Sequence, residues 1–156
     1  MAIESERKFL VRSSNWQDHA FESYAIRQFY LVASPDRSLR VRLKEGKAIL
    51  TLKLGGQGRV REEYEFPLSN EDAAAMQRHS IGQTIEKTRH IVRHMAQLYE
   101  VDVFGGGLTG LVLAELETED NVADADLPDW LGREVTGEPE FYNASLATRG
   151  LPADFS

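Results

Sequence analysis

The chain has 156 residues, no cysteine and a formal net charge of −7 at pH 7, and this length fits one domain (residues 1–156) that can bury a real core. The missing cysteines exclude disulfides and thiolate chemistry, and the acidic balance does not suggest a nucleic-acid partner. No apolar run approaches the length of a membrane span, so we expect a cytoplasmic protein without a membrane partner.

The first predicted element is a strand over Ile3–Leu10. Residues two apart in a strand point the same way, so Glu4, Glu6 and Lys8 would stand in a row on one face. The two carboxylates repel each other unless a cation lies near them, and the lysine adds a donor for an anion. Such a face can hold a hard metal ion together with a phosphate. A solvated edge strand of mixed charges is the simpler alternative.

The next stretch predicts a helix followed by a second strand. Ser13–Asn15 offers N-cap residues, and the apolar side chains of Trp16–Tyr24 have helical spacing. Ala25–Ala33 then alternates as a strand, but the alternation does not decide whether Phe29 or Tyr30 faces the polar side. On the sequence pattern alone, Tyr30 is a packed tyrosine with a bonded hydroxyl.

A predicted hairpin follows, and it carries only bases on the polar face of its first strand. In Leu39–Lys44, Arg40 and Arg42 alternate with apolar residues, and Lys44 continues the basic row. A turn leads into Ala48–Leu54, where Lys53 shares a face with other polar side chains.

The third strand of this group has mixed charge. Arg59–Phe66 places Arg61, Glu63 and Glu65 on one face. Pro67 ends the strand, and Ser69 and Asn70 can cap a helix that runs through Gln77.

Two strands in the second half of the chain carry opposite charges. Thr84–Met95 presents Lys87 and Arg89 on one face, and a hairpin then joins Gln97–Phe104 to Leu108–Thr118. The second strand of that hairpin presents only acids on its polar face. These acids are Glu115 and Glu117, followed by Glu119 just beyond the strand.

The remainder, residues 120–156, is rich in acidic residues, proline and turn formers. We expect one helical turn at Pro128–Gly132 and a short helix at Phe141–Leu146. Both are expected to pack over the sheet without extending it.

At least five strands thus separate apolar from charged side chains. A sheet with one wet face produces this pattern, and so does a closed barrel with a polar lumen and helices on its outer face. A wet sheet predicts scattered charges, whereas here bases and acids segregate by strand. Rows of aligned arginines are tolerable in an enclosed site only when a polyanion or facing carboxylates neutralise them. The pattern therefore favours a polyanion site.

The order of these motifs, over nearly the whole chain, resembles the CYTH-domain proteins, the triphosphate tunnel metalloenzymes. The resemblance implies an α+β fold in which eight antiparallel strands form a tunnel-like barrel, with a polar charged lumen and helices packed outside. The motifs in chain order are Glu4-x-Glu6-x-Lys8, Arg40-x-Arg42, Lys53, Arg61-x-Glu63-x-Glu65, Lys87-x-Arg89 and Glu115-x-Glu117.

The resemblance also implies an activity, the metal-dependent hydrolysis of a triphosphate, with inorganic tripolyphosphate as the expected substrate and Mg²⁺ or Mn²⁺ as cofactor. Lys8 and Tyr30 would be a catalytic pair near the reacting phosphate. The phosphate-binding residues would be Lys8, Arg40, Arg42, Lys53, Arg61, Lys87 and Arg89. The metal ligands would be Glu4, Glu6, Glu63, Glu65, Glu115 and Glu117.

Other functions stay open at this point. A class IV-type adenylate cyclase, or a nucleoside or thiamine triphosphatase, shares the same frame and would act on substrates such as ATP. A non-catalytic polyphosphate-binding module would keep the bases but could lose some carboxylates. A C-terminal segment lying across one mouth of the tunnel would favour a small substrate such as tripolyphosphate. The expected assembly is a monomer or a homodimer.

Overall fold

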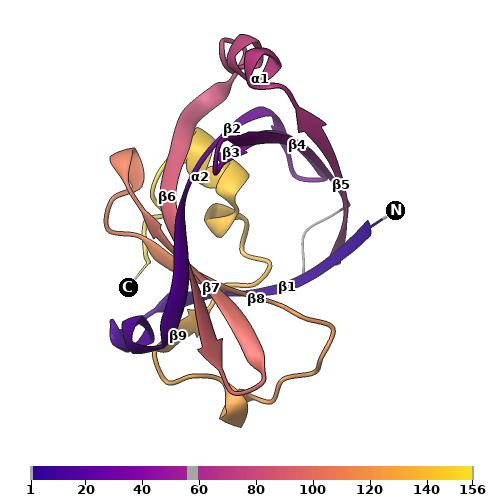
Figure 1. Cartoon of the computed structure of the whole chain (residues 1–156). Helices are drawn as coiled ribbons and strands as arrows, with labels where there is room; N and C mark the ends of the chain where they lie inside the picture. Colours follow the sequence, from indigo (N-terminus) through magenta and orange to yellow (C-terminus); the bar gives the residue numbers. More distant parts are fainter. Residues whose placement is uncertain (1, 56–59, 156) are drawn as a thin grey trace.

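The computed structural model describes residues 2–55 and 60–155, except for the side chains of residues 2–4. Within these residues, eight antiparallel strands form the wall of a closed barrel (Figure 1). They are β1 (Ala2–Val11), β2 (Ala20–Ser34), β3 (Arg37–Lys44), β4 (Lys47–Leu54), β5 (Val60–Leu68), β6 (Ile81–His94), β7 (Gln97–Phe104) and β8 (Val112–Glu117).

The first strand closes the barrel. The wall runs β5-β4-β3-β2-β6-β7-β8-β1, and the start of β1 returns to pair with β5. All of these pairings are antiparallel. Closure removes the exposed strand edges that an open sheet would present. The expected eight-stranded antiparallel barrel is therefore confirmed.

A ninth strand corrects one expectation. β9 (Leu131–Glu134) pairs with the far part of β1, with Val11 opposite Leu131. The helical turn expected at Pro128–Gly132 is wrong, because the Leu131 amide donates to Pro128 in a turn and the chain then enters β9. The expectation that the Pro128–Gly132 piece packs over the sheet without extending it is wrong for the same reason. Beyond its pairing with β5, this edge of β1 would leave backbone N–H and C=O groups unpaired, and β9 supplies their hydrogen-bond partners.

The helix expected over Trp16–Tyr24 is also wrong. Only Asn15–His19 is helical, as the 3-10 turn η1, and β2 already begins at Ala20. Ala20 lies opposite Val92 of β6, so the sheet supplies the backbone hydrogen bonds that a helix would have made. Of the apolar residues whose spacing suggested a helix, Trp16 is the buried one, with 5% of its surface exposed.

Alternation along the strands separates the lumen from an outer apolar layer. On β3, Arg40 faces the lumen while Val41 is fully buried on the outside, packed with Phe29 and Ala73. Ala73 belongs to α1 (Asn70–Gln77), whose N-terminus is capped by Ser69 as expected. No helix within residues 2–55 and 60–155 is long and apolar enough to cross a membrane.

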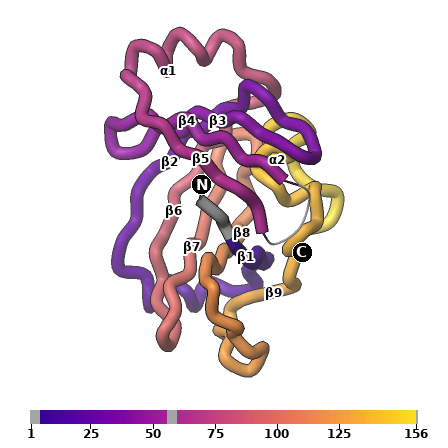
Figure 2. The backbone as a smooth tube through the Cα atoms, turned by 90° about the vertical axis from the view of Figure 1, so that its right-hand side faces the viewer, coloured from indigo at the N-terminus to yellow at the C-terminus, as the bar shows by residue number. Residues whose placement is uncertain are grey.

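One end of the lumen is apolar and is closed by the C-terminal segment, which we define as residues 135–150. Its 3-10 turn η4 (Pro139–Phe141) and helix α2 (Asn143–Arg149) lie together on one side of the strands (Figure 2). The helix expected at Phe141–Leu146 thus exists, two residues later. The cluster at this end comprises Leu10, Tyr30, Ile85, Phe104, Leu108, Leu111, Leu113, Val135, Phe141, Leu146 and Ala147.

Two further 3-10 turns complete the chain, η2 (Gly106–Leu108) and η3 (Asp124–Asp126). The strand expected over Leu108–Thr118 is therefore shorter, because residues 106–108 form η2 and β8 begins only at Val112. In η2, Leu108 is buried in the apolar end of the lumen. The part of the lumen on the other side of this apolar cluster holds a polar cavity.

Candidate active site

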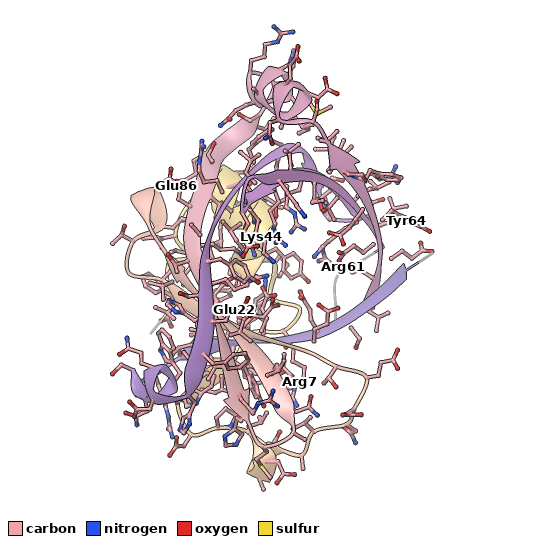
Figure 3. All side chains as sticks on the ribbon, in the orientation of Figure 1. Arg7, Glu22, Lys44, Arg61, Tyr64 and Glu86 are labelled. Carbon is pink, nitrogen blue, oxygen red and sulfur yellow. The ribbon has the colours of Figure 1, made fainter. Side chains whose placement is uncertain are left out.

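A polar cavity of about 270 Å³ occupies the barrel lumen next to the C-terminal segment. Side chains from β1 to β8, together with residues 136–144, line it. Figure 3 shows Arg61 pointing into the ring of strands and Tyr64, on the same strand, pointing away from it. The residues predicted from sequence that line the cavity are Glu6, Lys8, Tyr30, Arg40, Arg42, Lys53, Arg61, Glu63, Glu65, Arg89, Glu115 and Glu117.

Two predicted residues do not line the cavity or are not described. The Lys87 side chain is fully buried and lies behind the lining. The side chain of Glu4 lies outside the described residues. For Tyr30, the structure resolves what alternation left open, since Tyr30 lines the cavity and Phe29 packs in the outer cluster.

One wall of the cavity is a ladder across β3, β4 and β5. Arg40 lies opposite Thr51, and Thr51 lies opposite Glu65. The Arg40 guanidinium donates to Thr51 Oγ1 at 3.2 Å, and that hydroxyl donates to Glu65 at 3.4 Å. In the next row, Lys53 and Glu63 form an ion pair at 3.9 Å. Register alone therefore brings these charges together.

The opposite wall centres on Glu115, which lies directly across from Lys8. Its carboxylate is 3.7 Å from Lys8 Nζ and 3.9 Å from Arg89 Nη2. Burial alone would raise the pKa of Glu115, but the charges of Lys8 and Arg89 outweigh it and hold that pKa well below its usual range. Glu115 therefore stays ionised, and it is already paired with two cations of the lining.

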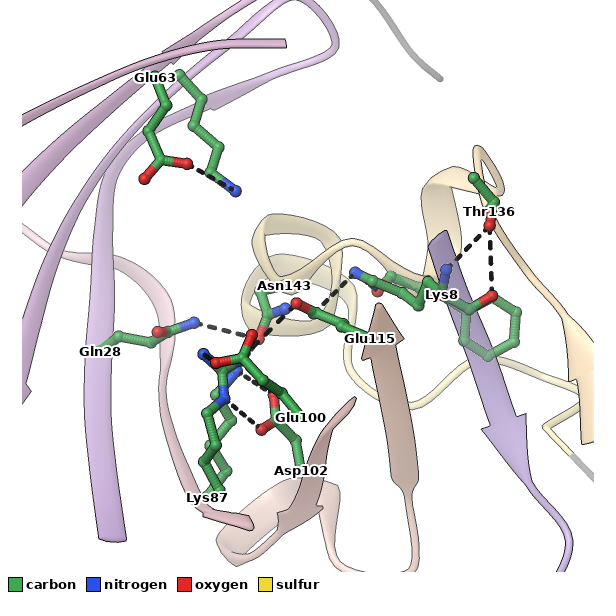
Figure 4. A network of polar contacts seen from close by, with 12 residues as sticks. Lys8, Gln28, Glu63, Lys87, Glu100, Asp102, Glu115, Thr136 and Asn143 are labelled. Atoms are coloured by element: carbon green, nitrogen blue, oxygen red, sulfur yellow. Dashed lines mark hydrogen bonds and ion pairs between the residues drawn. The ribbon is translucent and has the colours of Figure 1, made fainter. Parts of the chain in front are cut away.

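Asp102 is the strongest polar partner that sequence reasoning missed. It is 1% exposed and accepts from Arg89 Nε at 2.7 Å, Arg89 Nη2 at 2.8 Å and Lys87 Nζ at 2.7 Å (Figure 4). Burial lowers the pKa of Lys87 to about 7, although the carboxylate of Asp102 opposes this shift. Asp102 lies directly opposite Arg89 on β7, so a correct strand register would have found it.

Glu100, also on β7, is another lining residue that sequence reasoning missed. It lies opposite Glu115 and accepts from Arg89 Nη1 at 3.2 Å. Burial raises the pKa of Glu100, and the Arg89 charge only partly offsets this effect. A carboxylate beside Glu115 therefore adds to the negative charge that the arginine must balance.

Residues of the C-terminal segment complete the network. Asn143 Oδ1 accepts from Gln28 Nε2 at 3.1 Å and from Lys87 Nζ at 3.2 Å. Gln28 Oε1 in turn accepts from Arg42 Nε at 3.1 Å. Burial, together with the neighbouring cation of Arg40, lowers the pKa of Arg42 to about 10. A bound anion would relieve this crowding of positive charge.

The sequence of the whole chain agrees with this architecture. The sequence model of the CYTH domain matches residues 2–151. The chain belongs to the CYTH domain family. This family assignment confirms the resemblance drawn from the order of the charged motifs.

Two curated CYTH relatives carry the name inorganic triphosphatase. The one from Acetivibrio thermocellus is 37% identical over 147 residues, covering 94% of each chain. The one from Nitrosomonas europaea is 36% identical and covers 92% of this chain and 96% of its own. A crystal structure of an inorganic triphosphatase is similar with a TM-score of 0.67 and 32% identity, covering 94% and 95% of the two chains.

The triphosphate tunnel family is metal-dependent, and the carboxylates of the cavity are the groups that could hold a hard cation. Glu6 and Glu117 lie directly opposite each other on β1 and β8, and both line the cavity. Like charges at such positions destabilise a sheet, so a cation between them fits. Among the described residues, no three acidic or histidine side chains form a complete ligand set.

Proposed function

We propose that the protein hydrolyses inorganic tripolyphosphate to pyrophosphate and phosphate in this cavity, with a divalent metal ion. The observation that carries the proposal is a cavity beside the closed end of the lumen that brings basic and acidic side chains from β1 and from β3 to β8 together. Arg40 supports it further, because its Nε is buried without a hydrogen-bond partner among the described residues. A phosphate oxygen is the acceptor that such a donor lacks, since a buried unpaired donor is costly.

The charge balance of the lining supports metal dependence. Among the described residues, six lysines or arginines and six glutamates line the cavity, so its formal charge is zero. A triphosphate adds several negative charges to this balanced site. Divalent cations at the carboxylates would neutralise this excess negative charge. The bases of the lining cannot do so alone, because they already balance its glutamates.

The chain's own residues would bind and orient the substrate. The guanidinium groups of Arg40, Arg42 and Arg89 present planar N–H edges that suit phosphate oxygens. Lys8 and Tyr30, which both line the cavity beside the C-terminal segment, would contact the terminal phosphate. Phosphoryl transfer needs positioning and charge neutralisation more than covalent help.

The metal would be held by carboxylates of the cavity. Glu6 and Glu117 are the directly opposed pair, with Glu63, Glu65 and Glu115 in the same lining. When bound, the ion supplies charge stabilisation at the phosphoryl oxygens and a lowered pKa for a bound water. Oxygen donors alone favour Mg²⁺ or Mn²⁺ over zinc.

The closed end favours a small linear substrate over a nucleotide. Phe141 and Leu146 close the lumen beyond the cavity, so the nucleobase of a nucleotide substrate could lie only toward the other end of the lumen. An adenylate cyclase would need a site for adenine there, and an NTPase or thiamine triphosphatase would need one for its organic group. We therefore rank tripolyphosphate ahead of ATP.

Phosphate release from tripolyphosphate, ATP and thiamine triphosphate, with Mg²⁺ or Mn²⁺ and with cyclic AMP assayed in parallel, tests the proposal. The expected result is a clear preference for tripolyphosphate that chelation of the metal abolishes. Arg42→Ala should weaken the substrate interaction, whereas Arg133→Ala, which removes an exposed surface ion pair, should not. Preferred turnover of ATP, cyclic AMP formation, or no turnover would refute the proposed substrate.

A further inference from the structure

The ring of Tyr142 faces two cations of the cavity lining. The Arg61 guanidinium carbon lies 4.3 Å from the ring centroid, and Lys8 Nζ lies 5.7 Å from it. Arg61 comes from β5 and Lys8 from β1, while Tyr142 belongs to the C-terminal segment. Both distances are within the range in which a cation is attracted by the face of an aromatic ring. One aromatic side chain therefore contacts two bases that come from different strands.

The two residues that flank Tyr142 in the sequence are both held in place by contacts with the barrel. Phe141 is fully buried in the apolar end of the lumen, and its carbonyl accepts from Lys8 Nζ at 3.1 Å. Asn143 accepts hydrogen bonds from Gln28 and Lys87. The backbone that carries Tyr142 is thus fixed before any ligand binds, as a positioning group requires.

An aromatic partner suits a base that must also bind an anion. A carboxylate would occupy the N–H groups of Arg61, whereas the ring face of Tyr142 attracts the charge of the guanidinium without a hydrogen-bond acceptor. The N–H groups of Arg61 then stay available to bind phosphate oxygens, which lie in the plane of the guanidinium when they accept its hydrogen bonds. Lys8 uses one N–H for the Phe141 carbonyl, so the ring also helps to hold its remaining donors in place.

We propose that Tyr142 is a positioning residue for the triphosphatase reaction, holding Arg61 and Lys8 so that both contact the same end of the substrate. This inference rests on the proposed function for its kinetic readout. It also makes the C-terminal segment a working part of the site, beyond closing the lumen. The hydroxyl of Tyr142 is not needed for this role, and its π face is.

The test compares Tyr142→Leu, Tyr142→Phe and the matched control Tyr64→Leu, whose tyrosine points away from the ring of strands. Tyr142→Leu should lower kcat/KM for tripolyphosphate about tenfold, while Tyr142→Phe stays within about twofold of wild type. Tyr64→Leu should leave kcat/KM unchanged. In an Arg61→Ala background, Tyr142→Leu should cost clearly less than tenfold, because the ring acts partly through that guanidinium.

Tripolyphosphate binding without metal, measured by calorimetry in a chelator, gives a second readout that does not depend on turnover. If wild type failed to hydrolyse tripolyphosphate, the proposed function would fall, while the same variants would still test Tyr142 through this affinity. Fluorinated phenylalanines at position 142 cover the case in which the leucine variant does not fold, since fluorine weakens the ring face and keeps its shape. A stepwise loss with fluorination supports the role. Equal values across that series, a loss in Tyr142→Phe as large as in Tyr142→Leu, or full additivity with Arg61→Ala would overturn it.

Discussion

Replacing Asp102 by asparagine should destabilise the barrel more than any surface charge change. The carboxylate is 1% exposed and holds Arg89 through two hydrogen bonds and Lys87 through a third. Asparagine keeps the shape but presents an amide N–H₂ to one of these donors. The variant therefore removes the charge that Lys87 is paired with and leaves Arg89 only the carboxylates of Glu100 and Glu115.

The magnitude follows from the cost of breaking a buried ion pair from one side, which is about 3–5 kcal/mol. At roughly 2–4 °C per kcal/mol for a chain of this size, the melting temperature should fall by about 6–20 °C. Urea unfolding at pH 6, where Lys87 with its pKa of about 7 is charged, gives the free energy directly. Calorimetry of the same samples gives the melting temperature.

A matched control separates burial from charge. Arg133 also holds a carboxylate at 2.9 Å, that of Glu138, but this pair is solvent-exposed. Glu138→Gln should therefore leave the urea midpoint unchanged within error, because water screens the pair. A loss of less than about 1 kcal/mol for Asp102→Asn, or equal losses in both variants, would refute the argument from burial.

Two further predictions concern the neighbourhood of the cavity. Lys87→Met should weaken metal-free tripolyphosphate binding below pH 7, where wild-type Lys87 is charged. The affinities of the two proteins should converge as pH rises through the Lys87 pKa of about 7. A difference in affinity that does not depend on pH would contradict this prediction. Gly82→Ala should lower the melting temperature clearly more than Gly46→Ala, because both glycines have positive φ but only at Gly82 would a Cβ meet α2, 2.7 Å from the Ala147 carbonyl carbon. Equal losses in the two glycine variants would show that α2 does not depend on this close approach.

Strand alternation was sufficient to predict which side chains share the polar face of the strands. Arg40 and Arg42 fall on one side of β3 and Val41 on the other, because the period of a strand is fixed at two. The same rule placed Glu115 and Glu117 inside. The choice between a wet sheet and a closed barrel needed the family resemblance, since both give one polar face.

What the sequence could not predict depends on register between distant strands. Asp102 is recognisable as a partner only once Arg89 is known to lie across from it. The family resemblance of the Lys87-x-Arg89 motif implied that Lys87, like Arg89, binds phosphate, yet the environments of the two residues differ, and Lys87 lies behind the lining. Alternation gives the direction of a side chain but not its depth.

The two wrong helices have a related cause. Ala20 begins β2, and Leu131 begins β9, because each segment meets an unpaired strand edge in the fold. Local periodicity contains no information about that edge, and pairing overrides weak local preference.

The hydrogen bond from Lys8 to the Phe141 carbonyl joins residues 133 positions apart. During synthesis, β1 is made long before the segment that completes the cavity beside it. A nascent chain that has just completed β8 holds every strand of the wall and no floor for the cavity. Because contacts between distant residues form slowly, the cavity can be completed only after residues 135–150 have been made, and removal of these residues would open the site that β1 begins.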